Sequence, residues 1–562
     1  MDDKQDRPAK RPKLTSNSAS DPPENTHSPN LASLHHSITP PPARPGRVPL
    51  SPHQNSEKKD TPTTNTNQPQ LIPSPIQLTR IRDFSDSLKN NEDTVRLRDI
   101  LGDPMIRECW QFNYLFDVDF LMSQFDEDVR DLVSVKVVHG SWKSESDNKI
   151  RIDEASKRYS NVEPIVAYMP EPFGTHHSKM MVLLRHDDLA QVIIHTANMI
   201  SGDWANMCQA VWRSPLLPLN TNDDDEQKST LWGSGERFKR DLLAYLKAYG
   251  VKKTGPLTEK LSKYDFSAVR AALIASVPSK QKIGTSSNGD GKPLWGWPAL
   301  KDALQNIQLH EGDSNMMPHI VTQMSSIATL GQTDKWLKDV FFDALAPPRS
   351  TQTSKKQRPQ FSVMFPTAEE IRRSLNGYGS GGSIHMKLQS AAQQKQLQYL
   401  RPYLKHWAGD VADELPANIQ DAGRRRAAPH IKTYIRFTDG ESMDAIDWAL
   451  VTSANLSTQA WGAATNANGE VRICSWEVGV LVWPELYAMG PQSQSVAMVP
   501  CFKKDKPSSP RELPADAGAS TALVGFRMPY DLPLTSYAAQ DVPWCATMPH
   551  SEPDWLGQTW AA

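Results

Sequence analysis

Two stretches of this sequence repeat one unusual pattern, and the repeat limits what the chain can fold into. Each has a His-x-Lys tripeptide, an apolar run that ends in Ala-Asn, and a tryptophan six residues beyond the asparagine. The residues of the two copies are, in order, His177, Lys179, Asn198 and Trp204, and His430, Lys432, Asn455 and Trp461. A duplicated unit of strand, loop, strand and polar tip accounts for these spacings and predicts a fold with two related halves.

His-x-Lys occurs a third time, at His385 and Lys387. The residues that follow, "LQSAAQQKQLQ", have a helical pattern and contain no matching asparagine. With 15 histidines in the chain, about one such tripeptide is expected by chance. We therefore interpret this third copy as a chance occurrence.

The chain of 562 residues exceeds the usual size of one hydrophobic core. Residues 1–75 are rich in proline, serine, threonine and asparagine, which predicts a disordered tail. A polar stretch near residues 280–293 predicts a boundary between an N-terminal domain, 76–290, and a C-terminal domain, 291–562. Further Pro- and Lys-rich runs, at 347–359 and 504–519, predict surface loops.

Strand-like and helical patterns are mixed in both halves, which predicts an α/β fold. Strands are expected in "SVKVVHGSW", "VEPIVAYMP", "HHSKMMVLL", "AQVIIHTAN", "PHIVTQMSS", "HIKTYIRF", "DWALVTSAN" and "WEVGVLVWP". Helices are expected in "SGERFKRDLLAYLKAYG", which closes at Gly250, and in "AAQQKQLQYLRPYLKHWA".

Composition excludes several classes of protein. No apolar run is long enough to span a bilayer, and the N-terminus lacks the apolar core of a secretory signal. The net charge of −2 means that a polyanion would need a local basic groove. The five cysteines are scattered and form no CxxC pair, which argues against a disulfide framework and a zinc site. They are Cys109, Cys208, Cys474, Cys501 and Cys545.

Strand geometry separates the two adjacent histidines of "GTHHSK". Residues i and i+2 of a strand share a face, so His177 and Lys179 point the same way, as do His430 and Lys432. His176 points to the opposite face, where a hydrogen-bonded structural histidine is expected.

A doubled set of imidazole, ammonium and amide groups suits a phosphoryl centre that uses no metal. Lysine and asparagine side chains donate to non-bridging oxygens in place of a cation. One imidazole can attack phosphorus, while the other protonates the departing oxygen and later deprotonates water. No cofactor and no metal are expected.

These motifs resemble the phospholipase D superfamily and, within it, the tyrosyl-DNA phosphodiesterase family. The stretches that carry the resemblance are "GTHHSKMM", "HTANMISGDW", "APHIKTYIRF", "LVTSANLSTQAWGA", "SWEVGVLVWP", "QMSSIATLG" and "GYGSGGS". Superfamily lipases and nucleases carry an aspartate five positions after the lysine, where this chain has Leu184 and Phe437. The resemblance implies two phospholipase D-like domains, each a mixed sheet flanked by helices, related by pseudo-two-fold symmetry with one cleft between them.

The resemblance also implies roles for individual residues. His177 would be the nucleophile and His430 the general acid and base. The phosphate oxygens would be held by Lys179, Lys432, Asn198 and Asn455. Gln209 and Glu477 would orient the two histidines. Glu477 also stands out by itself, because a carboxylate in an apolar strand needs a partner; an edge-strand glutamate facing water is the alternative.

Residues that match DNA-contacting positions of the family lie in both halves. Those expected at DNA phosphates are Ser325, Ser326, Thr329 and Ser383. Phe173 matches an aromatic residue that stacks on a base, although a core phenylalanine is the alternative. Arg424 to Arg426 are expected in a solvated charged loop, with contact to nucleic acid as the alternative.

The implied reaction is hydrolysis of a 3′-phosphodiester between DNA and a tyrosine, such as that of a type IB topoisomerase, leaving a 3′-phosphate. The expected partner is DNA with a 3′-linked tyrosine or peptide, and a monomer is sufficient.

"AKRPKL", Ala9 to Leu14, resembles a nuclear-import signal and predicts a nuclear location. The alternatives are phospholipid or general nucleic-acid cleavage, and a DNA-binding scaffold without activity.

Overall fold

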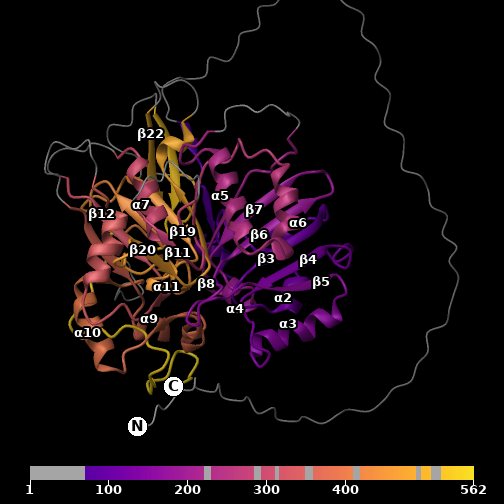
Figure 1. The fold of residues 1–562 in the computed structure, drawn as a ribbon. Coiled ribbons are helices and arrows are strands. Elements are labelled where there is room, and N and C mark those ends of the chain that lie inside the picture. The colour runs from indigo at the N-terminus through magenta and orange to yellow at the C-terminus, as the bar shows by residue number, and fades with distance from the viewer. Residues whose placement is uncertain are drawn as a thin grey trace, which may run out of the picture. The chain divides into compact units, whose positions relative to one another are not determined.

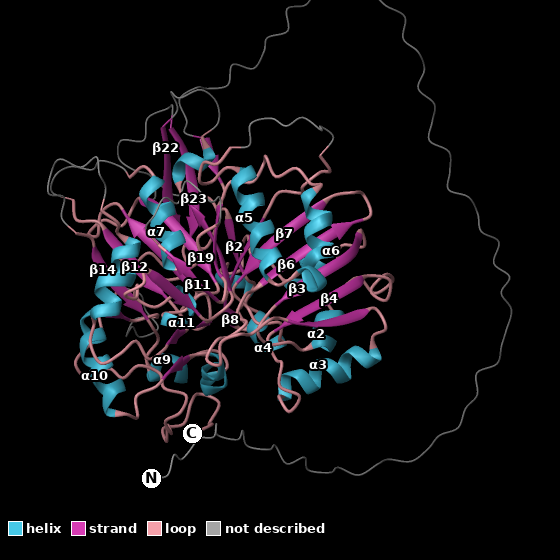
Figure 2. Ribbon diagram, in the orientation of Figure 1, coloured by secondary structure: helices cyan, strands magenta, loops and turns pink. Residues whose placement is uncertain are grey.

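Two large mixed β-sheets form the framework of the protein in the computed structural model (Figure 1). The structure describes residues 70–220, 229–283, 293–309, 316–348, 358–408, 418–488, 495–507 and 521–561. Helices lie against the sheets (Figure 2), so the predicted α/β fold is confirmed. Within the described ranges, no helix is both long and apolar enough to cross a membrane.

The first sheet has seven strands. The neighbours β3, β4 and β5 run parallel to one another. Along the other side of β3, each strand is antiparallel to the next, in the order β3, β6, β7, β9 and β2. Their order is β2 (Ile76–Leu78), β9 (Ala210–Arg213), β7 (Ala190–His195), β6 (Met180–Arg185), β3 (Ile106–Phe112), β4 (Ser134–His139) and β5 (Val162–Val166). The apolar runs predicted at β4, β5, β6 and β7 are therefore strands.

The second sheet has ten strands. Eight follow the order β1 (Gln70–Ile72), β23 (Thr521–Arg527), β22 (Ser495–Cys501), β19 (Ile446–Thr452), β18 (Thr433–Phe437), β12 (His319–Gln323), β14 (Gln360–Met364) and β16 (Leu404–Lys405). In addition, β21 (Glu477–Val482) pairs with β19 and with β10 (Ala272–Ser276). The strands predicted at β12, β18, β19 and β21 are confirmed.

Three short ladders complete the strand pairing. They are β8 (Met207–Cys208) with β17 (Ala428–Pro429), β11 (Ser279–Lys282) with β20 (Glu470–Ile473), and β13 (Ser326–Ile327) with β15 (His385–Met386). The β8–β17 ladder joins the segment after Asn198 to the segment before His430, so it brings the two repeated units together.

Helices of ordinary length are few, and many are single turns. The α-helices are α1 (Leu97–Leu101), α2 (Val118–Met122), α3 (Asp147–Arg158), α4 (Ser201–Ala205), α5 (Gly235–Ala248), α6 (Val251–Ser262), α7 (Trp297–Asn306), α8 (Asp343–Leu345), α9 (Ala368–Arg372), α10 (Ala391–Leu400) and α11 (Thr458–Trp461). The 3-10 and π elements are η1 (Asp86–Leu88), η2 (Trp336–Phe342), η3 (Gly377–Ser383), η4 (Arg401–Tyr403) and η5 (Pro484–Tyr487).

Helix α5 forms where the sequence predicts it. Ser234 caps its N-terminus by accepting from the backbone N–H of Arg237, and Phe238, Leu242 and Leu246 recur at helical spacing on its buried face. The apolar face packs into the core that also contains β6 and β7. The chain turns at Gly250, whose φ of 102° suits glycine, and α6 then begins; α6 was not expected from the sequence.

The helix predicted over "AAQQKQLQYLRPYLKHWA" is shorter than expected. It ends at Leu400, and the chain continues through η4 into β16. Pro402 provides the physical reason, because proline has no N–H to continue the helical hydrogen bonds and its ring crowds the carbonyl of the preceding turn.

Both His-x-Lys pairs precede their strands. The strand β6 begins at Met180 and β18 begins at Thr433, so the expectation that these pairs lie within strands is wrong. The side chains still alternate, since His176 and Ser178 both contact Tyr249 while His177 contacts Glu477. His176 Nδ1 donates to Asn113 O at 3.0 Å, and its Nε2 accepts from Tyr249 Oη at 3.0 Å, as expected of a structural histidine on the opposite face from His177.

The segment boundaries differ in part from expectation. Strand β1 lies inside the predicted tail, 1–75, yet it pairs with β23. Strands β10 and β11 precede residue 290, yet they pair with β21 and β20. The division into domains at residue 290 and the pseudo-two-fold symmetry stay predictions. Residues 1–69 and most of the predicted loops at 347–359 and 504–519 lie outside the described residues.

Candidate active site

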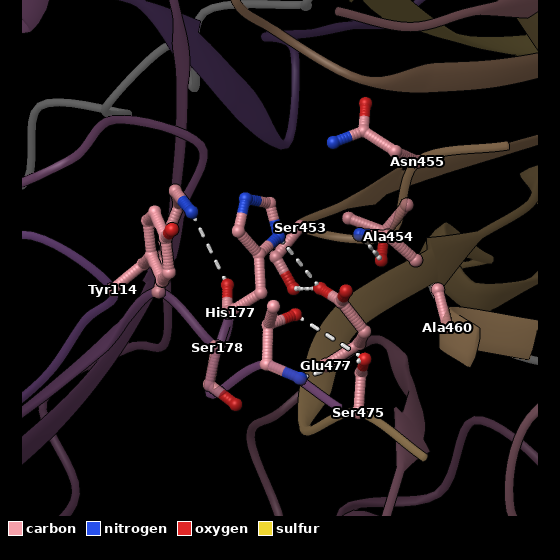
Figure 3. Close-up of polar contacts among 12 residues, drawn as sticks. Tyr114, His177, Ser178, Ser453, Ala454, Asn455, Ala460, Ser475 and Glu477 are labelled. Atoms are coloured by element: carbon pink, nitrogen blue, oxygen red, sulfur yellow. Dashed lines mark hydrogen bonds and ion pairs between the residues drawn. The ribbon is translucent and has the colours of Figure 1, made fainter. Parts of the chain in front are cut away.

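His177 lies just before β6 and faces a carboxylate from the distant strand β21. Its Nδ1 is 3.0 Å from Glu477 Oε2 (Figure 3), and its backbone N–H donates to Trp476 O at 2.9 Å. A carboxylate only accepts, so this contact places the imidazole proton on Nδ1 and leaves the Nε2 lone pair free. The ring of Tyr114 lies beside it, with 5.7 Å between ring centroids.

Glu477 is the first residue of β21 and is buried between β10 and β19, so the alternative of an edge-strand glutamate facing water is wrong. A hydroxyl fixes its position. Ser453 Oγ accepts from the backbone N–H of Val478 at 3.0 Å and donates to Glu477 Oε2 at 2.5 Å. Glu477 therefore meets the partner requirement of a buried carboxylate.

His430 is held by the same arrangement with an amide in place of the carboxylate. Gln209 Nε2 lies 3.0 Å from His430 Nδ1. Thr196 Oγ1 accepts from the backbone N–H of Ala210 at 2.9 Å and donates to Gln209 Oε1 at 2.8 Å. Cys208 O accepts from the backbone N–H of His430 at 3.1 Å, which holds this segment against β8.

The two histidines thus take their side-chain partners from each other's part of the chain. Glu477 follows His177 by 300 residues, and His430 follows Gln209 by 221 residues. The predicted pairing of histidines with Gln209 and Glu477 is present in the structure.

The two lysines lie beside the histidines and are buried. Lys179 Nζ donates to His177 O at 3.2 Å, and Lys432 Nζ donates to His430 O at 2.5 Å and lies 3.3 Å from His430 Nε2. Burial lowers the pKa of Lys179 to about 8. Burial and the ammonium of Lys179 lower the pKa of Lys432 well below its usual value. The two ammonium groups repel each other, which favours an anion between them.

Both histidines are neutral in the free site near pH 7. Burial, assisted by Lys179, lowers the pKa of His177 to about 4, although its side chain remains 14% exposed. Burial and Lys432 lower the pKa of His430 well below its usual value. A neutral imidazole at His177 has the lone pair that a nucleophile needs.

The two asparagines are held by different contacts. Asn455 Oδ1 accepts from the backbone N–H groups of Ser325 (3.1 Å) and Ser326 (2.9 Å), which leaves its Nδ2 to donate to a ligand. Asn198 is held through its backbone, since its N–H donates to Asp203 Oδ2 at 2.7 Å and its carbonyl accepts from Trp204 Nε1 at 3.0 Å. The tryptophan six residues later therefore fixes the first asparagine.

The second tryptophan of the repeat does something else. Trp461 Nε1 donates to Tyr434 Oη at 3.3 Å and has no such contact with Asn455 among the described hydrogen bonds. Equal spacing in the sequence thus reflects a shared fold of the two tips and not a shared hydrogen bond.

The residues predicted to contact DNA phosphates lie around the same site. Ser325 is buried beneath Asn455, and Ser326 and Thr329 line a pocket. Ser383 Oγ is 3.4 Å from Asp203 Oδ1. The pocket is also lined by His385 and Lys387, with Gln393 and Gln396. The third His-x-Lys, interpreted as a chance occurrence, therefore lies beside the predicted DNA-contact residues.

Phe173 is 79% exposed, which excludes the alternative of a core phenylalanine.

The expectation of a solvated loop is wrong for Arg424, because its side chain is buried and its Nη1 donates to Asn90 O at 2.6 Å. Arg425 pairs with Asp531 at 2.5 Å, and Arg426 lies over the ring of Trp555.

Sequence reasoning missed three residues that support the histidines. Thr196 and Ser453 stand two positions before the repeated asparagines, so a shared hydroxyl at this position was the available signal. Asp203 is 1% exposed, and its Oδ2 lies 3.3 Å from His430 Nδ1. Burial raises the pKa of Asp203, and the ammonium of Lys432 opposes that rise. Nothing in "MISGDW" distinguishes Asp203 from an ordinary acidic residue in the first turn of a helix.

Among the described residues, no group of three or more His, Cys, Asp or Glu side chains is arranged to hold a metal ion. All five cysteines are free thiols.

Comparison with known proteins places this site in context. The family model described as "Tyrosyl-DNA phosphodiesterase" matches residues 75–538. The chain is 31% identical to a probable tyrosyl-DNA phosphodiesterase of Schizosaccharomyces pombe, over 87% of this chain and 96% of that protein. It is 30% identical to tyrosyl-DNA phosphodiesterase 1 of Arabidopsis thaliana, over 84% and 74%.

The fold is also similar to that of a solved structure. The crystal structure of the yeast tyrosyl-DNA phosphodiesterase superposes with a TM-score of 0.59 at 19% identity, covering 84% of this chain and 99% of that one. At this identity the likeness concerns the fold.

Proposed function

Because the chain belongs to the tyrosyl-DNA phosphodiesterase family, we propose that it hydrolyses the 3′-phosphodiester bond between DNA and a tyrosine and leaves a 3′-phosphate. The tyrosine of a stalled type IB topoisomerase is the proposed substrate, and other 3′ adducts are proposed to be accepted as well. One observation carries the proposal: two histidines, each with its own lysine and asparagine, are held by partners from opposite parts of the chain.

In the first step Nε2 of His177 attacks phosphorus while the bond from phosphorus to the tyrosine oxygen breaks. The negative charge of the bound phosphodiester raises the pKa of His430, so that the ring is protonated in the complex and gives its Nε2 proton to that oxygen. The phenol of tyrosine has a pKa of about 10, so it leaves more readily than an alkyl alcohol, and protonation by a positioned acid contributes about 10²- to 10⁴-fold. The product is a phosphohistidine that links the DNA 3′ end to His177.

In the second step His430 takes a proton from water, and the resulting hydroxide attacks phosphorus. The bond from phosphorus to His177 Nε2 breaks, and the 3′-phosphate is released. Because Glu477 accepts at Nδ1, His177 departs as a neutral imidazole with its Nδ1 proton in place.

The lysines and asparagines stabilise the charge on the non-bridging oxygens during both steps. Lys179 and Lys432 supply two ammonium groups, and Asn455 supplies an amide whose oxygen is already engaged. No proposed step requires a metal or a cofactor.

DNA is proposed to bind across the two parts of the chain. Ser326, Thr329 and Ser383 are proposed to contact phosphates, and the exposed ring of Phe173 is proposed to stack on a base. We propose that one chain suffices for catalysis.

We also propose a nuclear location from "AKRPKL". Deletion of Ala9 to Leu14 in a fluorescent fusion should then shift the protein out of the nucleus.

Incubation with a 3′-phosphotyrosyl oligonucleotide in EDTA tests the function. The expected result is a 3′-phosphate oligonucleotide, with a protein–DNA adduct that accumulates in His430→Ala and is absent in His177→Ala. No cleavage by the wild-type protein would refute the activity, and loss of activity in EDTA with recovery on Mg²⁺ would refute the metal-independent route.

The alternative activities have less support. Leu184 and Phe437 are buried strand residues where superfamily lipases carry aspartates. An inactive DNA-binding scaffold would have no need for a second histidine with its own network of Gln209 and Thr196.

A further inference from the structure

The hydrogen bonds around Gln209 determine which way its amide faces. Thr196 Oγ1 accepts from Ala210 N–H, so its own hydrogen is directed at Gln209 Oε1. The amide therefore turns its NH₂ group toward His430 Nδ1, 3.0 Å away, while the engaged Oε1 lies farther off at 3.3 Å. The NH₂ group only donates, so the one atom of Gln209 that can accept the Nδ1 proton is Oε1, which also accepts from Thr196.

The proposed chemistry requires a proton on His430 Nδ1 in both steps. A ring that protonates the departing oxygen from Nε2 keeps its other proton on Nδ1. A ring that later takes a proton from water at Nε2 needs its lone pair there, which again places the proton on Nδ1. Lys432 Nζ, 3.3 Å from Nε2, donates to the same lone pair in the free site. His430 thus needs an acceptor at Nδ1, and the neutral oxygen of Gln209, already shared with Thr196, is a weaker acceptor than a carboxylate.

Asp203 is placed to be that acceptor. Its Oδ2 lies 3.3 Å from His430 Nδ1 and is fixed by the backbone N–H of Asn198 at 2.7 Å. The same oxygen lies 3.5 Å from Gln209 Nε2, and Oδ1 lies 3.4 Å from Ser383 Oγ. The side chain is 1% exposed, so its interaction with the ring is little screened by solvent.

We infer that Asp203 is a positioning residue for the reaction: it accepts the Nδ1 proton of His430 and stabilises the imidazolium, as Glu477 does for His177. The inference rests on the proposed function. Gln209 holds the edge of the ring, and Asp203 selects its tautomer. Each histidine then has a carboxylate, one from each part of the chain. The Nε2 proton moves to the departing phenolate and is replaced from water, while the Nδ1 proton stays between His430 and Asp203.

The change Asp203→Asn tests this role, because it keeps the shape and removes the charge. A 3′-tyrosyl oligonucleotide needs the acid in the first step, whereas a 3′-(4-nitrophenyl) oligonucleotide has a much more acidic phenol and does not. Cleavage of the tyrosyl substrate should slow about 10²-fold. Adduct formation from the nitrophenyl substrate should change little, and the adduct should persist because hydrolysis needs His430 as a base.

A matched control is Asp447→Asn, which removes another buried carboxylate, one that pairs with Arg436 at 2.8 Å. It should not separate the two substrates. Equal slowing of both substrates by Asp203→Asn, without a persistent adduct, would assign Asp203 a purely structural role and overturn the inference. An unchanged rate on both would do the same.

A second measurement needs no activity and no change at Asp203. The ¹⁵N chemical shifts of the His430 ring in the free wild-type protein, assigned by the loss of its signals in His430→Gln, report the tautomer. We expect the proton on Nδ1; a proton on Nε2 would overturn the inference. If the wild-type protein leaves the tyrosyl oligonucleotide intact, the proposed function fails, and the ring tautomer still decides the placement of the proton.

Discussion

The change Glu477→Gln should slow formation of the covalent adduct and leave its hydrolysis nearly unchanged. In the free site the carboxylate accepts from His177 Nδ1 at 3.0 Å. As Nε2 attacks phosphorus, positive charge develops on the ring, so the interaction with Glu477 is stronger in the transition state than in the free site. Glutamine keeps the shape of the side chain and removes the charge that stabilises the ring.

The size of the effect follows from the contact that is lost. A hydrogen bond to a charged group contributes about 1.5–3 kcal/mol, and about 1.4 kcal/mol is a factor of ten in rate. Adduct formation should therefore slow about 10- to 10²-fold. Ser453→Ala is the matched control, because it removes a neutral donor to the same carboxylate at 2.5 Å and should slow adduct formation by about tenfold or less.

Rapid quenching with a 3′-(4-nitrophenyl) oligonucleotide measures this step. Both changes are made in a His430→Ala background, where the adduct is not resolved and its formation is observed by itself. Two results together would refute the assignment of Glu477 as the partner of His177. The first is adduct formation at the parent rate in the double variant, and the second is slow hydrolysis of the adduct in the Glu477→Gln single variant, which retains His430.

Three further outcomes are expected. Adduct formation from the nitrophenyl substrate should lose rate only as pH falls through about 4, the lowered pKa of His177, because the lone pair is lost on protonation; an acid limb near the ordinary value of about 6.5 would contradict the burial argument. Burial lowers the pKa of His176 to about 3, so the folded protein binds fewer protons than the unfolded chain between about pH 6.5 and 3, and the free energy of unfolding should fall on acidification. In urea titrations, His176→Gln should reduce the slope of the free energy of unfolding against pH by about 1.4 kcal/mol per pH unit. An unchanged slope would contradict this. Lys387→Ala should weaken oligonucleotide binding and reduce the salt slope by about one, measured by fluorescence anisotropy; an unchanged slope would place Lys387 away from the phosphates.

The repeated polar residues could be predicted from the sequence because their spacing encodes one local structure twice. Alternation of side chains correctly separated His176 from His177, even though the strand begins only at Met180. The same reasoning identified Glu477, since a carboxylate inside an apolar strand needs a partner. Gln209 could be identified only by resemblance, because a buried glutamine has no distinctive pattern.

Other features depend on contacts that no local pattern encodes. Arg424 looks like part of a solvated basic run, yet the fold buries it against Asn90, 334 residues earlier. Asp203 acquires its role only because the β8–β17 ladder brings His430 beside it. The local sequence after His385 lacks an asparagine and so predicts a chance occurrence, whereas the position of His385 beside Ser326 follows from the pairing of β13 with β15.

The exchange of partners between the two histidines has a consequence for the protein during its own synthesis. His177 leaves the ribosome long before Glu477, which follows it by 300 residues. A chain that stops before His430 carries the histidine proposed to bond DNA without the carboxylate that orients it, and it lacks the second histidine that would release the DNA. Such a truncated product of translation therefore lacks both the group that speeds bonding to DNA and the group that ends it.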